Sequence, residues 1–503
     1  MMSLSFIRQS ENSMTVFRST LRTLAIAALM TAPLRLGAQS VAQRAISLAD
    51  ALKLAEKISH PVRTAEAGVL RARGQQMQSR AAYLPQINGS ANYQRTIESQ
   101  FAALSKGSGF SSTPTSSTTG ATKDTSSNSI GSISKIFAAP NTVTLGLTLS
   151  QSIFTAGKLD AATKSTEAAR TSAELNLDAA RAQLALDVAK AYYDAVASEQ
   201  LTQIADSTLA QTERTLRQTQ VSRSIGASAE FDLLRARVSR DNQRPVVIQA
   251  RGNRDVALLR LRQLLGIPLT TPLTLTTPIR DNGVAGAEPA AVQLSQPMML
   301  PGREAGVVAD TSVAHRSSVK AAEANVTSQE YALRAANWNR LPSMQFSSLY
   351  QRFGYPPDGT FLPNSFGNFY PNWTAAVGIS FPVFLGGKLT GDRMIAEANF
   401  AEAKQNLAQA KELAELDALT ALTTLNQSLA AYAASVGTDE QAAKAYSIAE
   451  VRYREGISTQ VELEQSRTQY QQARLNRVQA ARDLEVARLR VALLKDLPLS
   501  TGR

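Results

Sequence analysis

The sequence contains no cysteine and only two histidines, His60 and His315. The absence of cysteine excludes disulfides, thiolate metal sites and a lipid-modified N-terminal cysteine. Neither histidine lies at ligand spacing from a cluster of carboxylates, so we expect no metal site and no catalytic site. A glycine pair before Lys388 resembles a phosphate-binding loop, but Leu389 replaces the hydroxyl residue that such a loop requires. The chain is therefore expected to have no enzymatic activity and no cofactor.

Long apolar runs are also scarce. The one near the N-terminus, which ends at Met30, is too short to span a membrane, because a spanning helix needs about 20 apolar residues. Arg18 and Arg22 precede this run and the small residue Ala38 follows it, an order typical of a secretory signal peptide. We therefore expect residues 1–38 to be a signal peptide.

The chain is basic, with a formal net charge of +12. Its lysines and arginines are interspersed with acids along predicted helices, and no basic block occurs. We interpret them as solvated helix faces, so no nucleic-acid partner is expected.

What the chain does contain is an internal repeat. Leu84 and Pro85 recur as Leu341 and Pro342. Further on, five residues recur at one constant offset. These pairs are Phe154 and Phe384, Gly157 and Gly387, Lys158 and Lys388, Gly226 and Gly456, and Ser228 and Ser458. Because this part of the two halves aligns without a gap, we expect its elements to pack side by side over their whole length.

Each half is predicted to contain a helical segment, two strands and two long helices. Apolar residues alternate with polar ones in the strands, which gives each strand one apolar and one polar face. The predicted strands are Gln86–Arg95, Thr142–Ser150, Ser343–Arg352 and Asn372–Phe381. The predicted helices are Ser47–Lys57 and Val62–Ala81, broken at Pro61, then Lys158–Arg223 and Lys388–Arg454, with returning helices that end near Leu265 and Leu494.

A tight turn is predicted where each long helix reverses. Gly226 and Gly456 suit the left-handed position just after a helix. Ser228 in the first half, and Ser458 or Thr459 in the second, are candidate caps of the returning helices.

Four strands cannot close a barrel, because the smallest closed barrels have about 8 strands. An open sheet edge is also excluded from lipid, so several chains must contribute to one barrel. Three copies of four strands give 12, with long helices beneath them. Aromatic residues gather between Met344 and Phe384. Five of them are expected to form an interfacial girdle: Tyr350, Phe353, Phe369, Tyr370 and Trp373.

Several motifs, each weak alone, resemble the TolC-like outer-membrane efflux protein family (outer membrane factors) in their order and double occurrence. They are Ile46–Leu52, Leu84–Ile87, Phe154 with Gly157 and Lys158, Ala191–Tyr193, and Arg452–Tyr453 with Gly456, Ser458 and Val461–Leu463. The resemblance covers about residues 46–270 and 308–497.

This resemblance implies an α+β membrane protein: a homotrimer with a 12-stranded β-barrel, four strands per protomer, continued by a long α-helical barrel. The barrel would contact outer-membrane lipid and the helices would lie in the periplasm. The family also implies a periplasmic adaptor (membrane fusion) protein and an inner-membrane transporter of the RND, ABC or MFS type. The expected function is thus a passive exit duct of a tripartite efflux or type I secretion system.

The domains expected on this basis follow the repeat. They are a signal peptide, 1–38, a first repeat, 39–270, a linker or equatorial region, 271–311, a second repeat, 312–497, and a C-terminal tail, 498–503.

The family places a closed entrance at the periplasmic end. By match to the turn glycines, Asp232, Tyr453 and Glu462 occupy gate positions, while Arg235 and Gln465 stand where a further acid is expected. Carboxylates also favour helix N-termini, so capping alone is a second explanation of these acids. The resemblance assigns adaptor docking to the turns that contain Gly226, Ser228, Gly456 and Ser458.

A second hypothesis is a periplasmic structural coiled-coil or adaptor protein. It explains the long helices, but it does not explain paired amphipathic strands at matching places in both halves.

Overall fold

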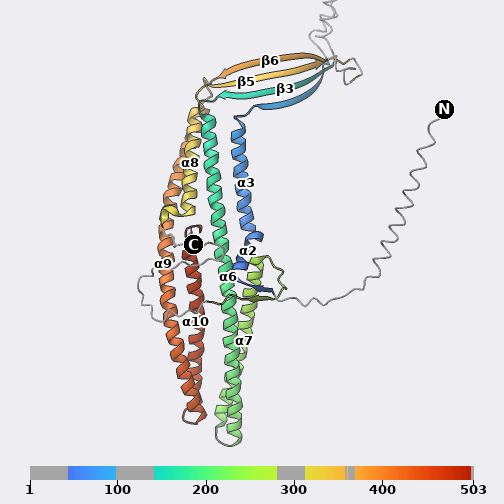
Figure 1. Cartoon of the computed structure of the whole chain (residues 1–503). Helices are drawn as coiled ribbons and strands as arrows, with labels where there is room; N and C mark the ends of the chain where they lie inside the picture. The colour runs from blue at the N-terminus through green and yellow to red at the C-terminus, as the bar shows by residue number, and fades with distance from the viewer. Residues whose placement is uncertain (1–43, 98–140, 280–311, 357–359, 361–368, 500–503) are drawn as a thin grey trace, which may run out of the picture.

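The structure is a computed structural model that describes residues 44–97, 141–279, 312–356, 360 and 369–499. The predicted signal peptide, most of the predicted linker and most of the C-terminal tail lie outside the described residues. Figure 1 shows a long rod of helices with a sheet across its upper end, so the two helical hairpin turns lie far from the strands.

The sheet contains the four predicted strands, all antiparallel, in the order β2-β3-β5-β6. Their bounds are Gln86–Arg95 for β2, Asn141–Phe154 for β3, Ser343–Gly354 for β5 and Phe369–Ser380 for β6. Among the described residues, the outer edges of β2 and β6 have no strand beside them, so the sheet is open. Pro371 lies in β6, where an edge position tolerates a residue without an N–H group.

Two helices of equal length dominate the rod. Helix α6 (Lys158–Ser224) and helix α9 (Lys388–Arg454) each have 67 residues, which corresponds to about 100 Å at ~1.5 Å per residue. Each begins directly after a glycine with positive φ, Gly157 at 83° and Gly387 at 85°. This backbone conformation turns the chain sharply from strand to helix, and it is one that glycine adopts readily.

Each long helix returns as a shorter one. Helix α7 (Glu230–Leu265) follows α6, and α10 (Gln460–Leu493) follows α9. Gly226 and Gly456 occupy the predicted left-handed positions, with φ of 75° and 73°. The turn glycines are therefore confirmed.

Three further helices flank the long ones: α2 (Leu48–Ile58), α3 (His60–Ala81) and α8 (Ser317–Trp338). The break between α2 and α3 falls at Ser59, which ends one helix and caps the next by accepting a hydrogen bond from the Val62 N–H. Pro61 lies inside the first turn of α3, so the prediction of a break at proline was wrong by two residues. A first-turn proline is tolerated because its missing N–H has no helical partner there.

A small parallel sheet, not predicted, lies beside the middle of the rod. It pairs β1 (Arg44–Ile46) with β4 (Leu273–Leu275). The fully buried Tyr192 of α6 contacts this sheet and the segment that follows it. Its hydroxyl donates to the Ile46 carbonyl of β1 at 3.1 Å and accepts from the N–H of Thr277, which lies just beyond β4, at 2.9 Å. Tyr192 thus anchors the start of the first repeat and the segment that follows α7.

A buried charge cluster ties the second repeat together at the same level. Arg316, which follows the short 3-10 helix η1 (Val313–His315), is fully buried and donates to Asp417 of α9 at 2.7 Å. Arg490 of α10 donates to the other oxygen of Asp417 at 2.8 Å. One carboxylate therefore joins α9, α10 and the residue before α8, and we call these three residues the equatorial clamp.

Candidate functional site

The strand register gives the sheet two chemically different faces. Residues directly opposite one another point to the same face, and successive residues along a strand alternate between faces. One face carries most of the apolar side chains. Its members are Ile87, Ala91, Tyr93, Val143, Leu145, Leu147, Leu149, Met344, Phe346, Tyr350, Trp373, Ala375, Val377 and Ile379. We call it the apolar face.

The opposite face is almost entirely polar. Its members include Gln86, Asn88, Ser90, Asn92, Thr142, Thr144, Thr148, Ser150, Gln345, Ser347, Gln351, Asn372 and Thr374. A sheet with one apolar and one polar face can separate lipid from water. Several residues depart from this division. They are Leu349, Phe353, Tyr370 and Ala376 on the polar face, and Arg95, Asn141, Gln151, Ser348 and Arg352 on the apolar face.

The aromatic girdle expected near the far ends of β5 and β6 is divided between the two faces. Tyr350, Phe369 and Trp373 fall on the apolar face, whereas Phe353 and Tyr370 stand in a row with Thr144 on the polar face. Trp373 is 75% exposed, and its indole N–H donates to the Ser348 hydroxyl at 2.9 Å. An amphipathic ring of this kind suits a membrane–water interface.

The predicted docking turns form the opposite end of the molecule (Figure 1). No heavy atom lies within 4 Å of a Cβ built on Gly226 or Gly456, so both turn tips face open space. Ser228 was expected to cap α7, and this prediction was wrong. Ala229 holds the N-cap position, and the Ser228 hydroxyl donates instead to the Thr219 carbonyl at 3.4 Å. Thr459 does cap α10, by accepting from the Glu462 N–H at 3.4 Å.

The candidate gate residues lie just above these turns, on three different helices. The Tyr453 hydroxyl of α9 lies 3.2 Å from the Thr219 hydroxyl of α6, so it joins the two hairpins. Glu462 of α10 pairs instead with Arg452 of α9 at 3.0 Å, within its own hairpin. In the described structure, the Asp232 carboxylate forms no hydrogen bond to Tyr453. The structure thus places these residues at one level without joining all three.

Other polar contacts between the hairpins were missed by the sequence analysis. Arg235 of α7 pairs with Glu464 of α10 at 3.3 Å. One helical turn higher, Arg467 donates to the Ser239 hydroxyl at 2.6 Å. With its amide oriented to satisfy its neighbours, Gln460 also donates to the Asp232 carbonyl at 2.9 Å. We call these α7–α10 contacts the hairpin ties; they join residues more than 220 positions apart, so no local pattern indicated them.

The hairpin ties are partly shielded from water: the Arg235 and Glu464 side chains are 36% and 18% exposed. The Arg467 side chain is 8% exposed, and its burial lowers the pKa of the guanidinium, an effect opposed by the nearby Glu464 and Tyr446. The Tyr446 ring stacks on Tyr470 at 5.7 Å between centroids, and burial raises the pKa of its hydroxyl. Arginine stays charged at neutral pH, and the raised pKa leaves the Tyr446 hydroxyl uncharged there.

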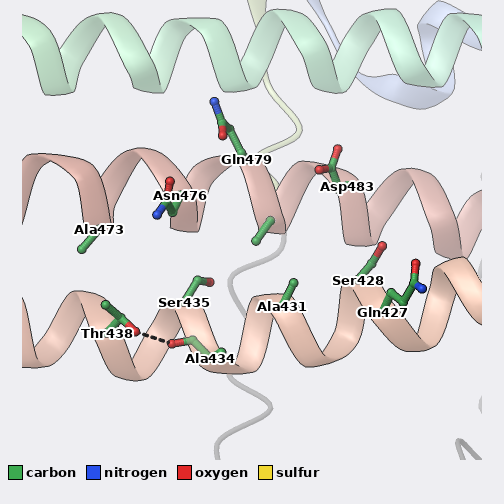
Figure 2. A pocket seen from close by; sticks show the side chains of 11 residues that line it. Gln427, Ser428, Ala431, Ala434, Ser435, Thr438, Ala473, Asn476, Gln479 and Asp483 are labelled. Atoms are coloured by element: carbon green, nitrogen blue, oxygen red, sulfur yellow. Dashed lines mark hydrogen bonds between the residues drawn. The ribbon is translucent and has the colours of Figure 1, made fainter.

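A shallow groove runs between α9 and α10, higher on the same hairpin. Figure 2 shows alanine, serine and amide side chains along it, with Asp483 at one end and Ala473 at the other. Its volume is about 520 Å³. Nothing in the groove combines an acid, a base and a nucleophile, so its chemistry is that of a packing surface.

Within the described residues, no helix is both long and apolar enough to cross a membrane.

Comparison with known proteins agrees with this geometry. The sequence model of the "Outer membrane efflux protein" family matches residues 51–267 and 308–494, one segment in each repeat. The outer membrane proteins SepC (probable efflux pump) and TtgF (toluene efflux pump), both from Pseudomonas putida, are each 29% identical over 312 residues. That alignment covers 59% of this chain and 59% of each relative.

The fold is similar to that of a solved channel. The open state of the MtrE outer membrane channel of Neisseria gonorrhoeae superposes with a TM-score of 0.66 and 20% identity, covering 91% of both chains. The resemblance inferred from the sequence motifs is thereby confirmed, as is the outer-membrane location. The chain belongs to the outer membrane efflux protein family.

Proposed function

We propose that this protein is the exit duct of a tripartite efflux or type I secretion system, through which substrates pass passively from the periplasm to the outside. The observation that carries the proposal is the two-faced, open-edged sheet joined directly to helices about 100 Å long. The apolar face would contact lipid, the polar face would line water, and the helices would continue the conduit.

Three copies form the duct in this proposal. An unpaired strand edge is not stable in hydrocarbon, where each unsatisfied backbone group costs several kcal/mol. Pairing β6 of one copy with β2 of the next closes a barrel of 12 strands and removes every edge, and the hairpins then form a helical barrel beneath it.

The partners follow from the ends of this duct. We assign docking of a periplasmic adaptor to the turns that contain Gly226, Ser228, Gly456 and Ser458, because both turn tips are open and lie farthest from the sheet. The adaptor would connect the duct to an inner-membrane transporter of the RND, ABC or MFS type.

The entrance gate belongs to the same proposal. Tyr453, through its contact with Thr219, would help hold the hairpins together, and Asp232 would contribute through its carbonyl, which accepts from Gln460. Glu462 would line the entrance and favour cations, although its pairing with Arg452 offsets part of its charge. The hairpin ties would stabilise the closed arrangement further.

Native mass spectrometry of the protein in detergent tests the assembly, and three copies per particle are expected. A stable monomeric membrane species would refute it. Planar-bilayer recordings test the gate. Tyr453→Phe combined with Gln460→Ala should raise single-channel conductance, because the pair of changes removes the contacts to Thr219 and to the Asp232 carbonyl. Glu462→Gln should weaken cation selectivity. Arg452→Gln is the matched control, because it exposes the Glu462 charge and should strengthen that selectivity.

A further inference from the structure

The junction between the sheet and the helices combines exposed apolar side chains with exposed cations. The chain crosses this level four times: between α3 and β2, between β3 and α6, between α8 and β5, and between β6 and α9. Each crossing carries one basic residue at its helical end. These residues are Arg80, Lys158, Arg340 and Lys388, and we call them the basic collar.

The collar cations are exposed and largely without acidic partners. In the described part of the chain, Lys158 and Lys388 form no ion pair, and Arg340 donates only to the Thr390 hydroxyl, at 3.3 Å. Arg80 lies 3.7 Å from Glu167, an exposed pair that contributes little. Three of the four cations therefore have no acidic partner in the described structure, and the fourth has only an exposed one.

Nearby carboxylates do not cancel this charge. Asp160 pairs with Lys164 at 3.0 Å, one turn below the collar, so this carboxylate is already neutralised. Two nearby carboxylates remain, Asp392 and Glu167, to balance the four collar cations. The cations of this level thus exceed its carboxylates by two in each copy.

On the sheet side of the collar, every crossing exposes large apolar side chains. Val383 and Phe384 are each 84% exposed, and the other members are 45% to 62% exposed. The other members are Tyr83, Leu84, Ile153, Phe154, Leu341, Phe381 and, at 50%, Leu385. We call these side chains the apolar rim; along the chain they lie between the collar cations and the strands or at the strand ends. Along the molecule, the sheet with its apolar face is thus followed by the apolar rim and then by the basic collar.

We propose that the basic collar binds the phosphate groups of anionic phospholipids in the leaflet of the outer membrane that faces the helices, while the apolar rim lies among their acyl chains. Lysine and arginine stems can lie along apolar surface while their charged ends reach the headgroups. Each cation near an anionic membrane surface strengthens attraction about fivefold. The inference rests on the proposed orientation of the helices toward the periplasm.

The test counts phospholipids bound to the purified full-length protein by native mass spectrometry. The probes are phosphatidylglycerol, a diacylglycerol with the same chains, and inorganic phosphate as competitor. The test variant carries Arg80→Gln, Lys158→Gln, Arg340→Gln and Lys388→Gln. The control variant removes the same charge from exposed cations far from the sheet, with Lys190→Gln, Arg217→Gln, Arg260→Gln and Lys444→Gln.

We expect phosphatidylglycerol to bind in preference to diacylglycerol and to resist inorganic phosphate at equal concentration. The test variant should lose affinity more than tenfold and the control less than twofold. If the test variant fails to fold, Lys158→Gln with Lys388→Gln should still lose at least fivefold.

Three results would overturn the proposal: equal losses in test and control variants, displacement of the lipid by inorganic phosphate, or retained lipid with altered ion selectivity. The last would mean that the collar lines the duct. A trimer that conducts normally without binding phosphatidylglycerol would refute the lipid site and leave the proposed duct intact.

Discussion

Replacing Asp417 with asparagine should destabilise the protein more than any other single Asp→Asn or Glu→Gln substitution in the helical rod. Asp417 is 5% exposed and accepts from two arginines, one of them fully buried. Removing one partner of a buried ion pair costs ~3–5 kcal/mol, because the remaining charge stays buried and unpaired. The Asp417→Asn variant keeps the shape but leaves Arg316 and Arg490 to repel each other, so we expect a loss in this range per chain.

The measurement is urea-induced unfolding in detergent, followed by helical circular dichroism at one fixed protein concentration, since oligomer stability depends on concentration. Asp439→Asn is the control: Asp439 accepts from a single, partly exposed arginine, Arg477, at 2.8 Å, and its loss should cost about 1 kcal/mol. Replacing both buried partners, with Arg316→Met and Asp417→Leu, should recover at least half of the stability. If Asp417→Asn costs no more than Asp439→Asn, the equatorial clamp does not stabilise the fold.

Three other outcomes are expected. In thermal melts, Gly157→Ala should destabilise the protein by at least ~1 kcal/mol, because φ is 83° and a Cβ would lie 2.8 Å from the Trp338 ring. Its control, Gly74→Ala in an open helical position, should stabilise the protein by ~0.5–1 kcal/mol. Gly456→Val should strain the left-handed turn, so export in cells should fall while the amount of inserted trimer stays constant, and unchanged export would argue against docking at this turn. Thr459→Ala should cost about 1 kcal/mol through the lost cap of α10, as measured by urea unfolding, whereas an unchanged midpoint would mean that water replaces the cap.

The elements of this fold were predictable where local chemistry specifies them. The two long helices match their predicted bounds to within one residue, because a glycine with positive φ stands before each start and close after each end. The strands were predictable because apolar and polar residues alternate along them. The pairing of β3 with β5, which joins the two repeats, was not predicted.

Contacts between distant segments could not be predicted from the sequence. The three-residue strands β1 and β4 are too short to show a period, and they lie more than 220 residues apart in the sequence. The same holds at the candidate gate: Tyr453 was found through a motif, but its partner Thr219 lies 234 residues away. The hairpin ties had no motif at all, since Arg235 was noted only as a departure from an expected acid.

The open edges of the sheet also constrain how this protein reaches its final place. A chain that has folded its helices but not met its neighbours carries two rows of unpaired backbone groups, along β2 and β6. In water such edges favour wrong pairings and aggregation, and in hydrocarbon they are unstable. In the proposed trimer, insertion into the membrane and edge pairing therefore happen together. The yield of inserted protein should consequently depend steeply on how many chains arrive at one site at one time.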